Sequence, residues 1–229
     1  MMRMVLWGVA VTFGAVSLAA AQGNPVAIAV LPFEDRGSYG QDKEVFRALE
    51  LGIPAVLASE LKNHPGVRLA DRARLGRALK SENLGADARV DATTAARVGG
   101  ESGARYAVTG NFADFYGKFR IDARLVEVGS GRILKVVSNS DPNLQDRAEL
   151  SRIIQDLAGK VLAAASLQQE GATSGVQARL VPTDALTQYS LGLLRESEGN
   201  KTKAGEHYQR ALSAFPNYPD AREAMHRIR

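Results

Sequence analysis

The sequence contains no cysteine among its 229 residues. This absence excludes disulfide bonds, a thiol nucleophile and a thiolate metal site, although an oxidising compartment would permit disulfides. We also expect no lipid anchor of the bacterial lipoprotein type, because such an anchor is attached to a cysteine. Histidine is scarce too, with three copies. His64 is expected in a turn, and His207 and His226 on helix surfaces, so a catalytic or ligand role is not expected for any of them.

The common catalytic motifs are missing as well. No HExxH, GxSxG or GxxxxGK(S/T) pattern occurs. The glycine-rich run 99–103 leads from an expected helix into an expected strand, which is the reverse of a phosphate-binding loop. Adjacent Glu34 and Asp35 are better explained by solvation than by acid–base chemistry. We therefore expect no catalytic residue, no metal ligand and no cofactor.

Charge of one sign is not in large excess. The net charge is +4, and both signs are interspersed along the chain. This pattern indicates an ordinary soluble surface rather than a nucleic-acid-binding one, so no nucleic-acid partner is expected. After the first 21 residues, no run is apolar and long enough for a membrane-spanning helix.

The first 21 residues have the pattern of a secretory signal peptide. Arg3 precedes an uncharged run over 5–21, which ends in the small residues Ala19, Ala20 and Ala21. We predict cleavage after Ala21 and a periplasmic mature protein. The alternative is a retained membrane anchor, but the run lies at the lower length limit for a spanning helix and is diluted by glycine, threonine and serine.

Hydrophobic patterning predicts an α/β domain over residues 25–167. Residues 26–33 are apolar throughout, which is typical of a central strand covered on both faces. A helix is expected from Pro54 or somewhat earlier to Lys62, then a short strand over 67–70. The pattern then predicts two helices, whose expected ranges are about 71–82 and 91–101.

From residue 104 onward the hydrophobic period changes to two. The pattern predicts strands over 104–116, 118–128 and 132 to about 138, arranged as an antiparallel meander with one solvated face. Val126 follows Leu125 directly, and this break in alternation predicts a bulge. A helix over 143–167 and a linker over 168–182 complete this part.

The C-terminal region 183–229 is predicted to be an all-α module. Leu191-Gly192, Ala204, Tyr208, Ala211 and Pro216 follow the spacing of a tetratricopeptide repeat, which this region resembles, although Arg195 stands where that pattern has an aromatic residue. Tetratricopeptide repeats bind proteins. Leu186, Tyr189 and Leu193 share one helix face and are the predicted protein-binding residues. The alternative is that this face packs against the helix containing Leu150–Val161, or against a second copy of the chain.

Four short sequences in the α/β region resemble the periplasmic domain of the CsgG family of curli-secretion proteins and the related FlgO- and TolB-amino-terminal-like domains. They lie at the expected strands and are 30–33, 68–72, 103–110 and 120–128 with the following Ser130-Gly131. The resemblance implies an α/β envelope domain concerned with exporting or assembling surface material. The hairpins that would form a pore are cut to the minimum here, at 116–118 and 139–145, so pore formation is not expected.

These observations predict a non-enzymatic periplasmic interaction protein. Its expected partners are envelope proteins that bind through the tetratricopeptide-like module, and a homo-oligomer is possible. The alternative is an enzyme or small-ligand sensor with a site at 34–40, at the carboxyl end of the first strand.

Overall fold

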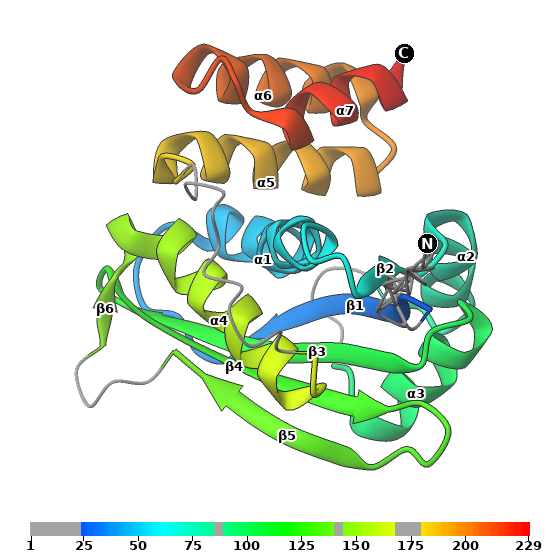
Figure 1. Ribbon diagram of the computed structural model, residues 1–229. Coiled ribbons are helices and arrows are strands. Elements are labelled where there is room, and N and C mark those ends of the chain that lie inside the picture. The colour runs from blue at the N-terminus through cyan, green and yellow to red at the C-terminus, as the bar shows by residue number, and fades with distance from the viewer. Residues whose placement is uncertain (1–23, 85–88, 140–143, 168–179) are drawn as a thin grey trace, which may run out of the picture.

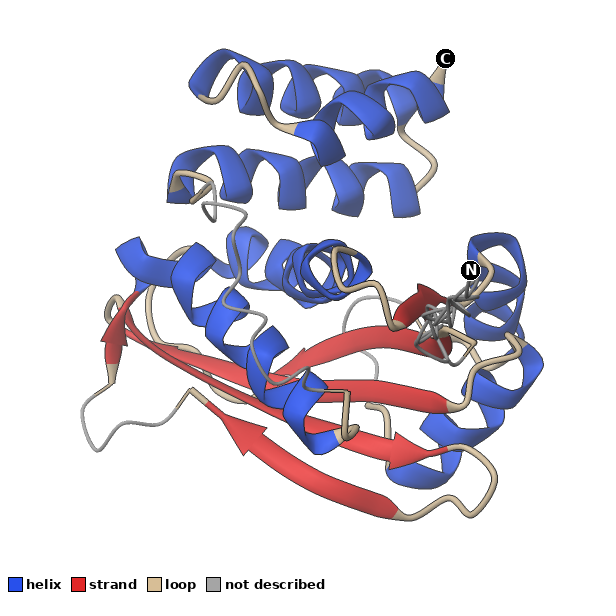
Figure 2. Ribbon diagram, viewed as in Figure 1, coloured by secondary structure: helices blue, strands red, loops and turns tan. Residues whose placement is uncertain are grey.

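The computed structural model describes residues 24–84, 89–139, 144–167 and 180–229. These residues form a mixed α/β structure with a curved sheet, a helical layer on the sheet and a second helical layer on top of the first (Figures 1 and 2). The strands are β1 (Val26–Asp35), β2 (Val67–Leu69), β3 (Tyr106–Phe115), β4 (Lys118–Glu127), β5 (Ile133–Ser138) and β6 (Gln145–Asp146). The helices are α1 (Lys43–Lys62), α2 (Arg72–Ser81), α3 (Ala92–Glu101), α4 (Leu150–Ala164), α5 (Thr183–Ser197), α6 (Lys201–Ala214) and α7 (Pro219–Ile228), with a 3-10 turn η1 (Arg147–Glu149) before α4. The predicted α/β class is confirmed.

The sheet has the strand order β2-β1-β3-β4-β5, and β6 pairs with the end of β4. β1 is parallel to both neighbours, whereas β3, β4 and β5 form the predicted antiparallel meander. The pairing of β4 with β5 shifts register between Leu125 and Val126. This shift confirms the bulge that the break in alternation predicted.

β1 is the central strand that its unbroken apolar sequence predicted. Ile28 and Phe33 face the larger core, which is covered by α1 and α4. Ala29 and Leu31 face a smaller core, which is covered by α2 and α3. Both faces of β1 are therefore buried, and this explains why its sequence does not alternate between apolar and polar residues.

Two helix boundaries differ from the sequence expectations. α1 begins at Lys43, and Pro54 lies inside it. Proline cannot donate a hydrogen bond to the carbonyl four residues earlier, yet the helix continues because its apolar face is buried on the sheet. α4 begins at Leu150 rather than at Asn143, because Gln145 and Asp146 pair with β4 instead of entering the helix.

The three C-terminal helices lie on the outer side of α1, with α5 in direct contact with it (Figure 1). A Cβ atom added to Gly52 of α1 would overlap the side chain of Ser190 in α5, so this glycine permits the close approach. A single apolar cluster runs from the sheet through α1 to Tyr208 and Ala221. The face of α5 that could have packed on α4 lies instead in the core shared with α1, α6 and α7, where Tyr189 contacts the rings of Tyr208 and Tyr218. The predicted signal peptide (1–21) and most of the predicted linker (168–182) lie outside the described residues.

Candidate functional site

The three predicted protein-binding residues lie at the interface between α5 and the rest of the chain. Leu186 and Tyr189 are buried, and Leu193 is partly buried against the same core. The ring of Tyr189 lies 5.9 Å from that of Tyr208 and 5.1 Å from that of Tyr218, measured between centroids. Burial raises the pKa of the Tyr189 hydroxyl well above its usual value. A partner reaches Leu186 and Tyr189 only if α5 first moves away from its neighbours.

The polar groups at the carboxyl end of β1 bind one another. Asp35 Oδ1 accepts hydrogen bonds from the backbone N–H and the hydroxyl of Ser38, at 2.9 and 2.7 Å. The Asp35 N–H donates to Glu50 Oε1 at 3.0 Å, and Ser38 Oγ accepts from the Asp114 N–H at 2.9 Å. Glu34 is paired with Arg36 and Arg89. These contacts engage Glu34, Asp35 and Ser38 within the protein, and they join the loop to α1 and β3.

That loop presents an exposed aromatic residue, and two more come from the neighbouring hairpin. Tyr39, Phe115 and Tyr116 are 55%, 38% and 83% exposed. Their ring centroids are separated by 5.7 Å for Tyr39–Phe115 and 6.1 Å for Tyr39–Tyr116. We call these three residues the aromatic cluster. Three large rings in contact on the surface are unusual for a soluble protein, where exposed apolar residues are normally scattered.

Hydrogen bonds and an ion pair connect the backbone segments that carry the aromatic cluster. The Tyr39 N–H donates to the Asp114 carbonyl at 2.8 Å and forms a bridge to β3 beside Phe115. Asp114 is buried, and its Oδ2 lies 3.0 Å from Arg147 Nη1. That side-chain contact is an ion pair whose geometry is not that of a hydrogen bond. The backbone N–H of Arg147 also donates a hydrogen bond to the Gly117 carbonyl at 2.7 Å. The hairpin and the loop are therefore joined by backbone hydrogen bonds and by an ion pair whose carboxylate, that of Asp114, is buried.

Tyr116 has an uncommon backbone conformation. Phe115 and Lys118 pair across the turn, so Tyr116 and Gly117 form a two-residue hairpin loop. Their φ angles are 53° and 86°. Positive φ at both positions defines a type I′ turn, which favours asparagine or glycine at the first position. A bulky side chain there is strained by about 1–2 kcal/mol, and strain of this kind is found at functional sites.

Charged pairs surround the aromatic cluster. Lys118 Nζ lies 3.0 Å from Asp146 Oδ2, and Arg147 Nη2 lies 3.5 Å from Asp42 Oδ2. An apolar centre with a polar, charged rim is the usual anatomy of a protein-binding surface. This site was not predicted from the sequence, because residues 116–118 were expected only to form a short turn. The available signal was a tyrosine, directly after a phenylalanine, at a position where a two-residue hairpin turn favours asparagine or glycine.

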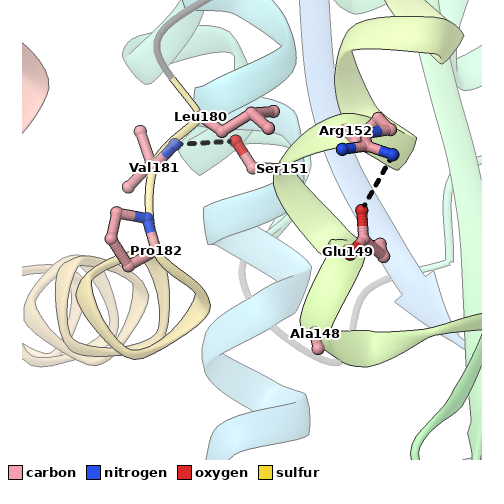
Figure 3. A pocket seen from close by; sticks show the side chains of 7 residues that line it. All are labelled: Ala148, Glu149, Ser151, Arg152, Leu180, Val181 and Pro182. Atoms are coloured by element: carbon pink, nitrogen blue, oxygen red, sulfur yellow. Dashed lines mark hydrogen bonds and ion pairs between the residues drawn. The ribbon is translucent and has the colours of Figure 1, made fainter.

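A small hollow of about 140 Å³ lies between the start of α4 and the segment that leads into α5 (Figure 3). The Val181 N–H donates to Ser151 Oγ at 3.1 Å, and Glu149 pairs with Arg152 at 3.3 Å. Figure 3 shows both contacts at the rim of the hollow. Ligand pockets usually have about 300–1,000 Å³. The hollow is therefore an attachment point for the C-terminal helices rather than a ligand site.

The described ranges contain no group of three or more histidine, aspartate or glutamate residues placed to hold a metal ion. Within the same ranges, no helix combines the length and apolarity needed to span a membrane.

The fold and the exposed surface define a mixed α/β protein with a helical cap and an exposed aromatic cluster. No protein-family model matches the sequence, and no curated protein matches it either. Among solved structures, the NMR structure of E. coli LpoB matches with a TM-score of 0.41 and 16% identity, over 50% of this chain and 55% of that one. The LpoB C-terminal domain from Escherichia coli gives 0.38 and 16%, over 49% of this chain and 79% of that one. The corresponding domain from Salmonella enterica gives 0.37 and 15%, over 50% and 81%. The first match spans little more than half of the LpoB chain, and likeness at this level does not assign a function.

The comparisons overturn the family resemblance expected from the sequence. Assignment to the CsgG, FlgO and TolB-amino-terminal-like domains is wrong, because no family model matches and the three solved structures named above are of LpoB. Assignment of residues 183–229 to the tetratricopeptide repeats is wrong as well, because no family model matches the sequence. The four short sequences coincide with strands and the turns beside them. The small residue Gly192 in 183–229 lies where α5 and α6 pack closely together. Both patterns are requirements of packing that unrelated folds share.

Proposed function

We propose that this chain is a non-enzymatic protein of the cell envelope that acts by binding a protein partner through the aromatic cluster. The observation that carries the proposal is the exposure of Tyr39, Phe115 and Tyr116 as one group on the β3–β4 hairpin and the loop that is bridged to it. Tyrosine provides a large apolar area together with a hydroxyl, and only two side-chain torsions must be fixed on binding. Aromatic side chains at the centre of a surface carry much of the binding energy of protein complexes.

The periplasmic location rests on the pattern at residues 1–21. A basic residue, an apolar run and three alanines support secretion with cleavage after Ala21. Cell fractionation followed by N-terminal sequencing tests this proposal. We expect a soluble periplasmic protein beginning at Gln22, and an intact Met1 in the membrane pellet would contradict it.

Two further sequence predictions remain proposals. The first is the division into a domain at 25–167, a linker at 168–182 and a helical module at 183–229. The second is a protein-binding role for Leu186, Tyr189 and Leu193, which requires α5 to move away from its neighbours in the chain. The aromatic cluster needs no such movement, so it is the preferred binding site.

Site-specific photo-cross-linking tests the binding role of the aromatic cluster. Tyr116 is replaced by a photoreactive phenylalanine in full-length protein in its native cells, and a matched control carries the same residue at exposed Glu206 of α6. We expect a discrete heavier adduct from position 116 and none from position 206. A second substitution, Tyr39→Ser, should remove the adduct while the melting temperature stays the same.

The mass of the adduct identifies the kind of partner. An adduct at twice the mass of the chain would identify a second copy as the occupant. Equal labelling from both positions, or an adduct that survives Tyr39→Ser, would contradict the proposed function.

A further inference from the structure

The outer edge of β5 is a second surface, separate from the aromatic cluster, on which large apolar side chains are exposed. β5 is the last strand of the main sheet order, and no strand in the described part of the chain pairs with its outer edge. Ile133, Leu134 and Val136 are 44%, 39% and 54% exposed. Proteins normally protect such an edge, because an open row of backbone groups beside apolar side chains invites pairing with another strand.

The backbone pattern shows which groups of β5 are open. The Asn139 N–H donates to the Ile121 carbonyl, so residue 139 points its backbone groups toward β4. In an antiparallel pair the bonding residues alternate, so residues 137 and 135 also point toward β4 and residues 138 and 136 point outward. Lys160 Nζ of α4 donates to the Ser138 carbonyl. Among the described residues, the outward N–H and C=O of Val136 therefore have no strand partner at the centre of the edge.

Positive charge lies beside this open edge. A hollow of about 640 Å³ between β5 and α4 is lined by Lys135, Val136, Val137, Ser138, Lys160, Ala163 and Ala164. Two of these residues are lysines, and the described residues that line the hollow include no carboxylate. Because side chains alternate along a strand, Lys135 lies on the α4 side together with buried Val137, and Val136 lies on the opposite face.

We propose that β5 binds an extended segment of a partner protein, which adds a strand to the sheet and alternates acidic with apolar residues. Its backbone pairs with Val136, its carboxylates face Lys135 and Lys160, and its apolar side chains cover Leu134 and Val136. Strand addition of this kind takes affinity from main-chain bonds and specificity from alternate side chains. This surface uses different residues from the aromatic cluster and does not depend on the function proposed above.

The charges exclude a second β5 strand as the preferred occupant. The β5 sequence over 133–138 contains one lysine and no acidic residue. Pairing two copies edge to edge would bring Lys135 and Lys160 of one copy toward the same residues of the other, and like charges facing each other destabilise a strand pair. An acidic segment meets opposite charge at the same positions.

Two capped probe peptides test this proposal on the full-length protein by fluorescence anisotropy. One alternates valine with glutamate, and the other alternates valine with lysine. We expect saturable binding of the glutamate peptide alone. Lys135→Glu should reverse the preference, and because Lys135 is exposed this variant should fold like the parent.

A backbone variant separates strand pairing from simple charge attraction. Val136→Pro removes the outward N–H while leaving the ladder between β4 and β5 intact, and Val136→Thr is the matched control that keeps it. We expect the proline variant to bind the glutamate peptide about ten-fold more weakly, and the threonine variant to bind like the parent. The melting temperatures of all three proteins should agree.

Three results would overturn the proposal. They are equal binding of both peptides, unchanged binding by Val136→Pro, and sedimentation showing a dimer that Lys135→Glu strengthens. If the proline variant unfolds, the reversal of preference in Lys135→Glu still decides the outcome.

Discussion

The ring of Tyr208 occupies the space that a side chain on Gly192 would need. A Cβ atom added to Gly192 would overlap two carbon atoms of that ring, so α5 and α6 cross with the ring of one against the bare backbone of the other. The Tyr208 hydroxyl donates to Glu196 Oε2 at 2.6 Å, and Arg227 donates to both carboxylate oxygens of Glu196 at 2.7 Å. This tyrosine therefore joins the three C-terminal helices, and it is not free to swing aside.

Gly192→Ala should consequently destabilise the protein. An overpacked core costs about 1–3 kcal/mol, which exceeds the gain of about 0.5–1 kcal/mol from alanine in a helix. Urea unfolding should show a net loss of about 1–2 kcal/mol. Gly159→Ala is the control, because Gly159 lies in α4 with nothing near its added Cβ atom. This control should be neutral or more stable, and an equal loss in both variants would argue against the crossing described here.

Much of the architecture follows from sequence patterns. The unbroken apolar run of β1, the alternation from residue 104 and the paired break at Leu125 and Val126 predicted a central strand, a meander and a bulge, and all three are present. These patterns are reliable because burial on one or both faces directly dictates residue type. The start of α1 was missed, because helix propensity places Pro54 at a boundary whereas tertiary packing carries the helix through it.

The candidate sites were harder to predict than the fold. Exposure of Tyr39 depends on the β1–α1 loop bridging to Phe115, a contact between residues far apart in the chain. The free edge of β5 depends on the whole strand order. The face of α5 was predicted as amphipathic, but the sequence could not show that the rings of Tyr208 and Tyr218 cover part of it within the same chain. The short sequences that resembled known families led to a wrong family assignment, because buried strands and closely packed helix pairs require similar residues in many folds.

Acid pH should favour docking of α7 through Asp220. Burial, and secondarily the negative charge of Glu223, raises the pKa of Asp220, while the Ser59 hydrogen bond and Lys62 act in the opposite direction. Burial also raises the pKa of nearby Glu60. A raised folded-state pKa means that the stabilisation is complete below the ordinary carboxyl pKa and is lost as the pH rises through the folded-state value.

The variant Asp220→Asn isolates this contribution, because Asn keeps an oxygen for the Ser59 hydroxyl and carries no titrating charge. We expect the variant and the parent to be about equally stable near pH 4, and the variant to be the more stable of the two at pH 7. Burial is the main cause that lowers the pKa of His207, so this residue reduces stability in acid. Its contribution is the same in the variant and the parent, and it therefore cancels when the two are compared at the same pH. A difference that stays constant between pH 4 and pH 7 would contradict the assignment.

Tyr189→Ala should show whether the α5 face is structural. The side chain is buried between the rings of Tyr208 and Tyr218, so truncation should cost about 3–5 kcal/mol of unfolding free energy. Gln209→Ala on the exposed face of α6 is the control and should have little effect. Loss of partner binding by Tyr189→Ala with an unchanged melting temperature would instead support a docking role for this face.

Tyr116→Asn should separate binding from stability in the aromatic cluster. Asparagine accepts positive φ with less strain than tyrosine, and the Tyr116 ring is 83% exposed and stacks on that of Tyr39. We therefore expect the variant to gain about 0.5–1 kcal/mol of stability, since strain relief of about 1–2 kcal/mol is offset by one lost ring contact. Cross-linking from a photoreactive residue at position 39 should lose its adduct in the same variant. Tyr116→Phe, which keeps the ring and the strain, should retain both the adduct and the parental melting temperature. A destabilised Tyr116→Asn protein would show that the tyrosine supports the turn, and its position at the turn would then no longer indicate a binding role.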